Sequence, residues 1–146
     1  MSLSQFARHL GVAAAAGIVA EREALEESCK IVEKEAKRVI GTYDYPWPPL
    51  AQETVDTRVR LGFTPDDPLL RTGELRNSIE HNVEGHLALR GYRGVVGSNL
   101  DKAVYQELGT SKIPPRSFLL GAALHKGLEV AELCGRYVVR GLLTVP

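Results

Sequence analysis

Residues 25–41 read LEESCKIVEKEAKRVIG, and they indicate the first element of the fold. Its apolar residues recur at spacings of three and four, which places them on one side of a helix. These residues are Leu25, Cys29, Val32, Ala36, Val39 and Ile40. Charged residues occupy the other sides, and no proline occurs before Gly41. We therefore expect one long helix from about Leu3 to Ile40, ended by the glycine.

The first half of this helix is built from small residues. Gly11, Ala13 to Ala16, Gly17 and Ala20 have almost no side-chain bulk, so another backbone can approach closely. Two interpretations remain open, namely packing within the chain or packing against a neighbouring subunit. Leu10 to Ala20 also has the outline of a signal peptide. Because no Lys/Arg cluster precedes it and it is too short to cross a bilayer, we expect neither a leader nor a membrane span.

A proline-rich loop follows the long helix. Residues 42–50 read TYDYPWPPL and hold three of the nine aromatic residues, Tyr43, Tyr45 and Trp47. The loop is either pinned on the core or a contact surface for another subunit. Beyond it, Gln52 to Leu61 fits either a short helix or an extended arm.

A change of period indicates a small antiparallel sheet after this arm. Asn77 to Val83, His86 to Arg90 and Gly94 to Ser98 are short segments with alternating or β-branched residues. Gly85 and the run Gly91 to Gly94 separate them, which predicts a three-stranded meander.

Two further helices complete the prediction. Asp101 to Leu108 fits a short helix with Asn99 or Asp101 as its cap and Gly109 at its end. A pair of prolines then forces an extended segment before a long helix at Ser117 to Leu143. Its apolar stripe comprises Leu120, Leu124, Leu128, Ala131, Val138 and Leu142.

The order of these elements predicts the α+β class, with helices packed on one face of a small antiparallel sheet. At 146 residues the chain corresponds to one domain. Within it we expect a helix at 1–41, an irregular arm at 42–68 and the sheet region at 69–98. Residues 99–146 then hold the short helix, the proline turn and the C-terminal helix.

Composition narrows the function classes. With 44% apolar and 25% charged residues, the chain resembles ordinary globular proteins. Eighteen basic and eighteen acidic residues give a formal net charge of zero, which disfavours tight binding of nucleic acid. Cys29 and Cys134 lie far apart, and the four histidines have no metal-ligand spacing. We expect two reduced thiols, no metal and no cofactor.

Two strings carry more information than the periodicity. Residues 68–79 read PLLRTGELRNSI, residues 105–119 read YQELGTSKIPPRSFL, and GVVGSN lies between them at 94–99. In this order and at this separation, they resemble the neck or tail-completion proteins of tailed bacteriophages, also called minor tail or virion morphogenesis proteins. WPPLAQET at 47–54 is similar to the tryptophan-containing arm of related phage families. Ser117 departs from the family pattern, which has a second proline there.

The matching residues fit turns and helix ends. They are Thr72, Gly73, Leu75, Ser78, Gly97, Tyr105, Glu107, Gly109, Thr110, Pro114, Arg116 and Phe118. Thr72 and Gly73 fit a tight turn, in which the glycine supplies a positive φ. Arg116 is placed to pair with Glu107, and the serine at 117 fits a helix N-cap. The set serves either fold maintenance or a subunit interface, and we expect no catalysis from it.

The resemblance implies a structural virion protein that is not an enzyme. Such proteins form a ring, hexameric or dodecameric, at the head-to-tail junction, where the ring joins the tail to the capsid connector and lets DNA pass without tight binding. The implied partners are other copies of the chain and the neck, connector and tail-tube or terminator proteins. The implied location is the virion, after synthesis in the bacterial cytoplasm, with no membrane contact. A tail terminator that caps the tail tube is the alternative.

A ring needs two different contact surfaces on every subunit. The small-residue helix with Gly11 and Gly17 is one candidate surface. The loop with Tyr43, Tyr45 and Trp47 is the other.

Two other function classes are remote alternatives. An enzyme would depend on His81 and His86 near Glu80 and Glu84. A nucleic-acid-binding module would depend on the last 35 residues, which hold five basic and two acidic residues.

Overall fold

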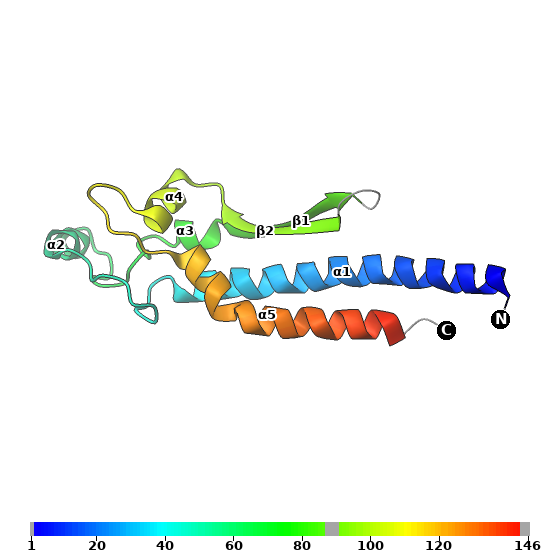
Figure 1. The fold of residues 1–146 in the computed structure, drawn as a ribbon. Helices are drawn as coiled ribbons and strands as arrows, with labels where there is room; N and C mark the ends of the chain where they lie inside the picture. The colour runs from blue at the N-terminus through cyan, green and yellow to red at the C-terminus, as the bar shows by residue number, and fades with distance from the viewer. Residues whose placement is uncertain (1, 87–90, 144–146) are drawn as a thin grey trace. The chain divides into compact units, whose positions relative to one another are not determined.

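The computed structural model describes residues 2–86 and 91–143, and it has the predicted α+β class (Figure 1). In chain order the elements are α1 (Leu3–Val39), α2 (Gln52–Arg60), α3 (Glu74–Asn77), β1 (Ile79–His86), β2 (Gly91–Ser98), α4 (Asp101–Leu108) and α5 (Phe118–Leu143). The long first and last helices and the short helix at 101–108 are confirmed. No helix in the described part of the chain is long and apolar enough to cross a membrane.

The chain divides into two compact units, each built from segments that are distant in sequence. Unit 1 comprises residues 1–31, 81–95 and 127–146, and unit 2 comprises residues 32–80 and 96–126. Both long helices and the hairpin contribute residues to each unit.

Unit 2 contains a closed hydrophobic core. Phe118, Ile79 and Val39 are fully buried there. The rest of the core comprises Ala36, Ile40, Tyr45, Leu75, Ala103 and Ala122. The residues predicted from the helical spacing at 32–40 therefore face this core.

Gly41 ends α1 as predicted. Its φ is 91°, and its N–H donates to the carbonyl of Pro68 at 2.8 Å. A Cβ here would lie 2.8 Å from a methyl carbon of Leu70, so both the backbone angle and the space require glycine.

A buried carboxylate also belongs to unit 2. Arg38 donates to both oxygens of Glu35, at 2.8 and 2.9 Å, and the Tyr45 hydroxyl donates to Oε1 at 3.0 Å. These bonds, that of Arg38 first, lower the pKa of Glu35 from 4.5 to about 2. Burial of the ring, followed by the hydrogen bond to the same carboxylate, raises the pKa of Tyr45.

Unit 1 has a much smaller interior. Its buried side chains among the described residues are Ala24, Ser28 and Cys29. The Ser28 hydroxyl lies 3.6 Å from Cys134 Sγ, and both cysteines are free thiols as predicted. A Cβ on Gly141 would lie 3.2 Å from the Cβ of Ala20, so α5 passes closely beside α1 at this point.

The sheet is a two-stranded antiparallel hairpin within the described residues, so the predicted three-stranded meander is wrong. Gly85 lies inside β1, and Gly91 to Gly94 begin β2 instead of forming a turn. A Cβ on Gly85 would lie 2.6 Å from the carbonyl oxygen of Gly91, so this glycine permits close strand approach. Of the predicted strand at 86–90, residues 87–90 lie outside the described residues.

The predicted apolar stripe of α5 is exposed. Leu120 and Leu124 in unit 2, and Leu128 and Val138 in unit 1, are each more than half accessible. The side chain of Leu142 lies outside the described part. The buried side of α5 is therefore not the predicted apolar stripe. The apolar spacing predicted the helix correctly but not the side that packs against the rest of the chain.

Candidate functional site

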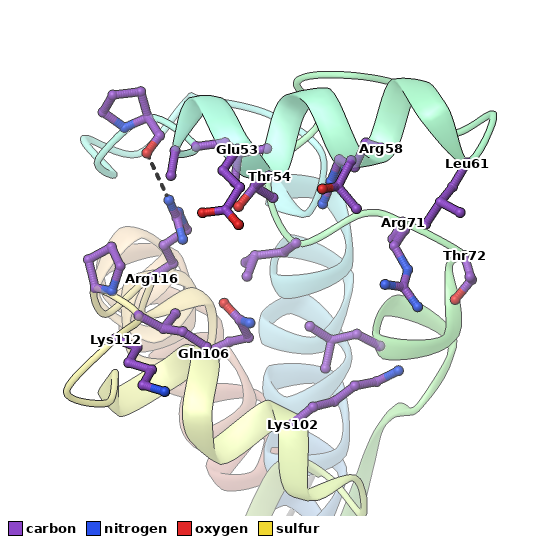
Figure 2. Close-up of a pocket in the computed structure, with 18 of the residues that line it drawn as sticks. Glu53, Thr54, Arg58, Leu61, Arg71, Thr72, Lys102, Gln106, Lys112 and Arg116 are labelled. Atoms are coloured by element: carbon purple, nitrogen blue, oxygen red, sulfur yellow. Dashed lines mark hydrogen bonds between the residues drawn. The ribbon is translucent and has the colours of Figure 1, made fainter.

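The segments 68–79 and 105–119 meet in unit 2, where several of their residues line a cleft of about 790 Å³ (Figure 2). One wall is α2 with the loop before it, and a second is the segment 69–75. The third is α4 with the proline turn after it, which Gln106 and Lys112 mark in the figure.

Glu107 closes the N-terminus of α5. Its carboxylate accepts the backbone N–H groups of Leu119 and Leu120, both at 2.9 Å. The predicted cap, Ser117, instead donates its hydroxyl to the backbone carbonyl of Glu107 at 2.9 Å. An acidic side chain at this end also interacts favourably with the helix dipole. Residues of the second string thus fasten α4 to α5.

Arg116 does not pair with Glu107, and that prediction is wrong. Its Nη2 donates to the carbonyls of Pro48 and Pro49, at 2.9 and 3.1 Å, because Glu107 is occupied by the helix end. Arg116 is only 5% exposed. Burial lowers the pKa of its guanidinium. The side chain fastens the proline-rich loop to the turn before α5.

The Gly-Thr turn has the expected geometry. Gly109 has a φ of 76° and ends α4, and a Cβ there would lie 2.9 Å from the carbonyl oxygen of Ile113. Thr110 donates its N–H to that carbonyl at 2.8 Å, and its hydroxyl accepts the N–H of Lys112. Only glycine fits at the first of these positions.

The first string forms a turn and a short helix. Gly73 has the predicted positive φ, 82°, and precedes α3. The Thr72 hydroxyl accepts the N–H of Glu74 at 3.4 Å, and Leu75 is buried in the core. The Ser78 hydroxyl donates to the carbonyl of Leu75 at 2.7 Å.

Three other motif residues have separate environments. Tyr105 is about half exposed on α4, and Pro114 lines the cleft. A Cβ on Gly97 would meet no atom within 4 Å, so nothing in the described chain requires glycine there. The predicted caps of α4, Asn99 and Asp101, are wrong, because Leu100 is its N-cap residue and no described side chain forms a capping hydrogen bond there.

The candidate interface residues are divided between the interior and the surface. Tyr45 lies in the core and Trp47 packs against it, with ring centroids 5.5 Å apart. Tyr43 is exposed, and its hydroxyl donates to Asp66 at 2.6 Å. A Cβ on Gly11 or Gly17 would meet no atom within 4 Å, so packing within the described chain does not explain these two glycines.

The sequence pattern did not indicate two of the buried charged residues in the described chain, Glu35 and Arg58. Glu35 lies three residues after Val32 and four before Val39, so the helical spacing already placed it on the apolar side. Arg58 is 8% exposed, and its Nη1 donates to the carbonyls of Asp67 and Leu70, at 2.7 and 3.0 Å. No periodicity in α2 marks Arg58, because its partners come from a loop.

The histidines of the enzyme alternative do not meet in a described site. His81 Nε2 lies 3.2 Å from Glu26 Oε1, and the side chain of His86 lies outside the described part. No group of three or more potential metal ligands occurs among the described side chains. No family model matches the chain, and no curated protein or solved structure matches it.

Proposed function

We propose that the chain is a structural protein of a tailed-phage virion, a subunit of the ring that joins the tail to the capsid connector. In this role the chain takes part in assembly and catalyses no reaction. The two strings that resemble neck and tail-completion proteins support it. Their residues lie together in unit 2, around the cleft between α2, the segment 69–75 and α4.

The observation that carries the proposal is an uncovered apolar surface on α5, which we call the α5 face. It consists of Leu128, Ala131, Gly135, Val138, Val139 and Leu143. Leu128 is 75% exposed and Leu143 is 80% exposed. A group of exposed apolar side chains on one side of a helix is typical of an interaction site. The charged Glu132 lines the same surface beside Gly135, Val139 and Leu143. In a ring, the neighbouring subunit covers it, and a different surface of each subunit makes the opposite contact.

The charge balance agrees with a DNA conduit. The net charge of zero gives no strong attraction for phosphates, and the segment Glu21 to Glu27 has four acidic residues and one basic residue. DNA can pass a lumen of this kind without being held.

The test is electron microscopy of particles from a phage that carries a premature stop codon in this gene, beside a complemented control. The proposal predicts DNA-filled heads separated from finished tails. Abnormally long tails would contradict a joining role and favour a tail terminator. Normal infectious virions would contradict any essential role in assembly.

A complementation assay in the same phage tests the α5 face itself. Leu128→Glu with Val138→Glu places two carboxylates on the face, and we expect at least a hundredfold loss of infectious particles. The matched control is Val104→Glu with Leu108→Glu, which changes two exposed apolar residues of α4. Circular dichroism of both purified variants shows whether they fold. Equal loss in both variants would contradict a specific role for the α5 face.

A further inference from the structure

The cleft of unit 2 is positively charged although the whole chain is neutral. Among the described residues, five basic and two acidic side chains line it. One of the acidic residues, Glu74, is paired with Lys102. The charges that remain are those of Arg58, Arg71, Lys112, Arg116 and Glu53.

The two arginines that hold the walls have no carboxylate partner in the described part of the chain. The hydrogen bonds of Arg58 and Arg116 all end on backbone carbonyls. Carbonyl dipoles replace the lost hydration, but they leave the full charge of each guanidinium in place. An anionic group in the cleft would compensate that charge.

The rim of the cleft adds further unpaired positive groups. Arg71 is exposed and stacks over the ring of Phe63 at 5.4 Å, and Lys112 is exposed. Neither has a carboxylate partner in the described ranges. Figure 2 shows Arg116 and Lys112 on the side of the cleft opposite Arg71. An extended ligand crossing the cleft would meet positive charge at both ends of its path.

The uncharged lining mixes polar side chains, Thr54, Thr57, Thr72 and Gln106, with apolar ones, and it contains no aromatic ring among the described residues. The apolar ones include Leu50, Leu61, Leu69, Leu75, Ile113 and Pro114. The volume lies in the range of ordinary ligand sites and accommodates a few residues of extended chain. Nucleic acid is disfavoured, because bases would have no aromatic side chain to stack on. Apolar pockets between cationic groups fit a peptide whose acidic and apolar side chains alternate.

We infer that this cleft binds an extended acidic segment of a partner protein, whose carboxylates are received by Arg71, Lys112 and the guanidiniums of the walls. The segment comes from a different protein. The chain's own acidic run at 21–27 is helical, and its Glu26 and Glu27 already bond to Lys30.

Fluorescence anisotropy with a labelled ELEELE peptide tests the inference on the full chain at physiological ionic strength. We expect saturable binding, and binding of the matched peptide QLQQLQ at least tenfold weaker. Equal binding of the two peptides, or no binding, would overturn the inference.

Variants of the rim locate the peptide while leaving the arginines of the walls intact. Because partly exposed ion pairs contribute modestly, Arg71→Ala with Lys112→Ala should weaken binding about five- to twentyfold. The control, Arg60→Ala with Arg76→Ala, removes two exposed charges outside the cleft and should change binding by less than about twofold. Glu53→Gln should tighten binding, because it removes the remaining negative charge of the cleft. Equal loss in the two double variants would overturn the inference.

Two further measurements exclude other occupants. A labelled oligothymidylate that binds more tightly than the peptide, and loses binding in the rim variant, would overturn the peptide assignment. Sedimentation of the chain alone checks for a second copy as the occupant. Self-association that the rim variant abolishes would overturn the assignment to a different protein.

Discussion

Unit 2 and unit 1 share the same two long helices but differ in the size of the side chains that they bury. Unit 2 closes a core around Phe118, Ile79 and Val39, and every charged group in its interior is bonded. Unit 1 buries only small side chains among its described residues, and it leaves the α5 face in contact with solvent. A helix pair of this kind gains little from its own packing.

We infer from this contrast that unit 2 provides most of the stability and that unit 1 provides the surface for assembly. Unit 2 contains the fastened turns, so changes there should act on the free energy of unfolding. Unit 1 has open helical surface, so changes on that surface should act on association and leave the folded subunit almost intact.

The largest effect is expected from truncating the core of unit 2. Phe118→Ala removes a fully buried ring and should lower the free energy of unfolding by about 3–5 kcal/mol. Leu128→Ala, on the α5 face, is the counterpart and should cost less than about 0.5 kcal/mol. Urea denaturation of the two variants measures both values. Similar losses would show that the two units do not differ as described.

Acid should destabilise unit 2 through Glu35. Its folded-state pKa of about 2 lies below the ordinary value of 4.5, so the carboxylate stabilises the fold above about pH 4.5. This contribution, on the order of 3 kcal/mol, is lost as the pH falls from 4.5 towards 2. Glu35→Gln should flatten this part of the stability profile measured by urea denaturation. An unchanged slope in the variant would assign the acid sensitivity to other groups.

The interior of unit 1 has no space for an added side chain at Gly94. A Cβ there would lie 2.4 Å from the Sγ of Cys29, which is buried. Gly94→Ala should therefore cost about 1–3 kcal/mol, measured by thermal unfolding. Adding Cys29→Ala removes the sulfur atom and should restore part of the loss. A double variant no more stable than the single one would place the strain elsewhere.

The smallest of these effects concerns the end of α5. Glu107→Ala leaves the N–H groups of Leu119 and Leu120 without their acceptor and should cost about 1–2 kcal/mol. Glu107→Gln keeps an acceptor oxygen but not the charge, so its loss should be about half as large. Urea denaturation gives both values. A glutamine variant as unstable as the alanine variant would contradict a capping role.

Much of this architecture could be predicted from local signals. The spacing at 25–41 predicted α1 and its buried side, Gly41 and Gly109 predicted two helix ends, and Gly73 predicted a turn; all three glycines have positive φ. These predictions succeeded because helix periodicity and positive φ depend on neighbouring residues. The strand count failed because Gly85 lies inside a strand, where contact with the neighbouring strand requires glycine, and no local pattern reveals that contact.

The site was less predictable than the fold. Arg116 and Glu107 were expected to pair because they are close in sequence and opposite in charge. Backbone groups took both side chains instead, the helix N–H groups in one case and the loop carbonyls in the other. Competition of this kind depends on three-dimensional placement. Arg58 could not be identified for the same reason, because its acceptors lie in a turn that has no periodic pattern.

Amide hydrogen exchange shows whether neighbouring subunits cover the α5 face, when dilute free chain is compared with the same chain in necks isolated from virions. We expect residues 127–143 to exchange rapidly in the free chain and to become protected in the assembly, while the core segments of unit 2 are protected in both. Unchanged exchange of residues 127–143 in the assembled necks would contradict this expectation.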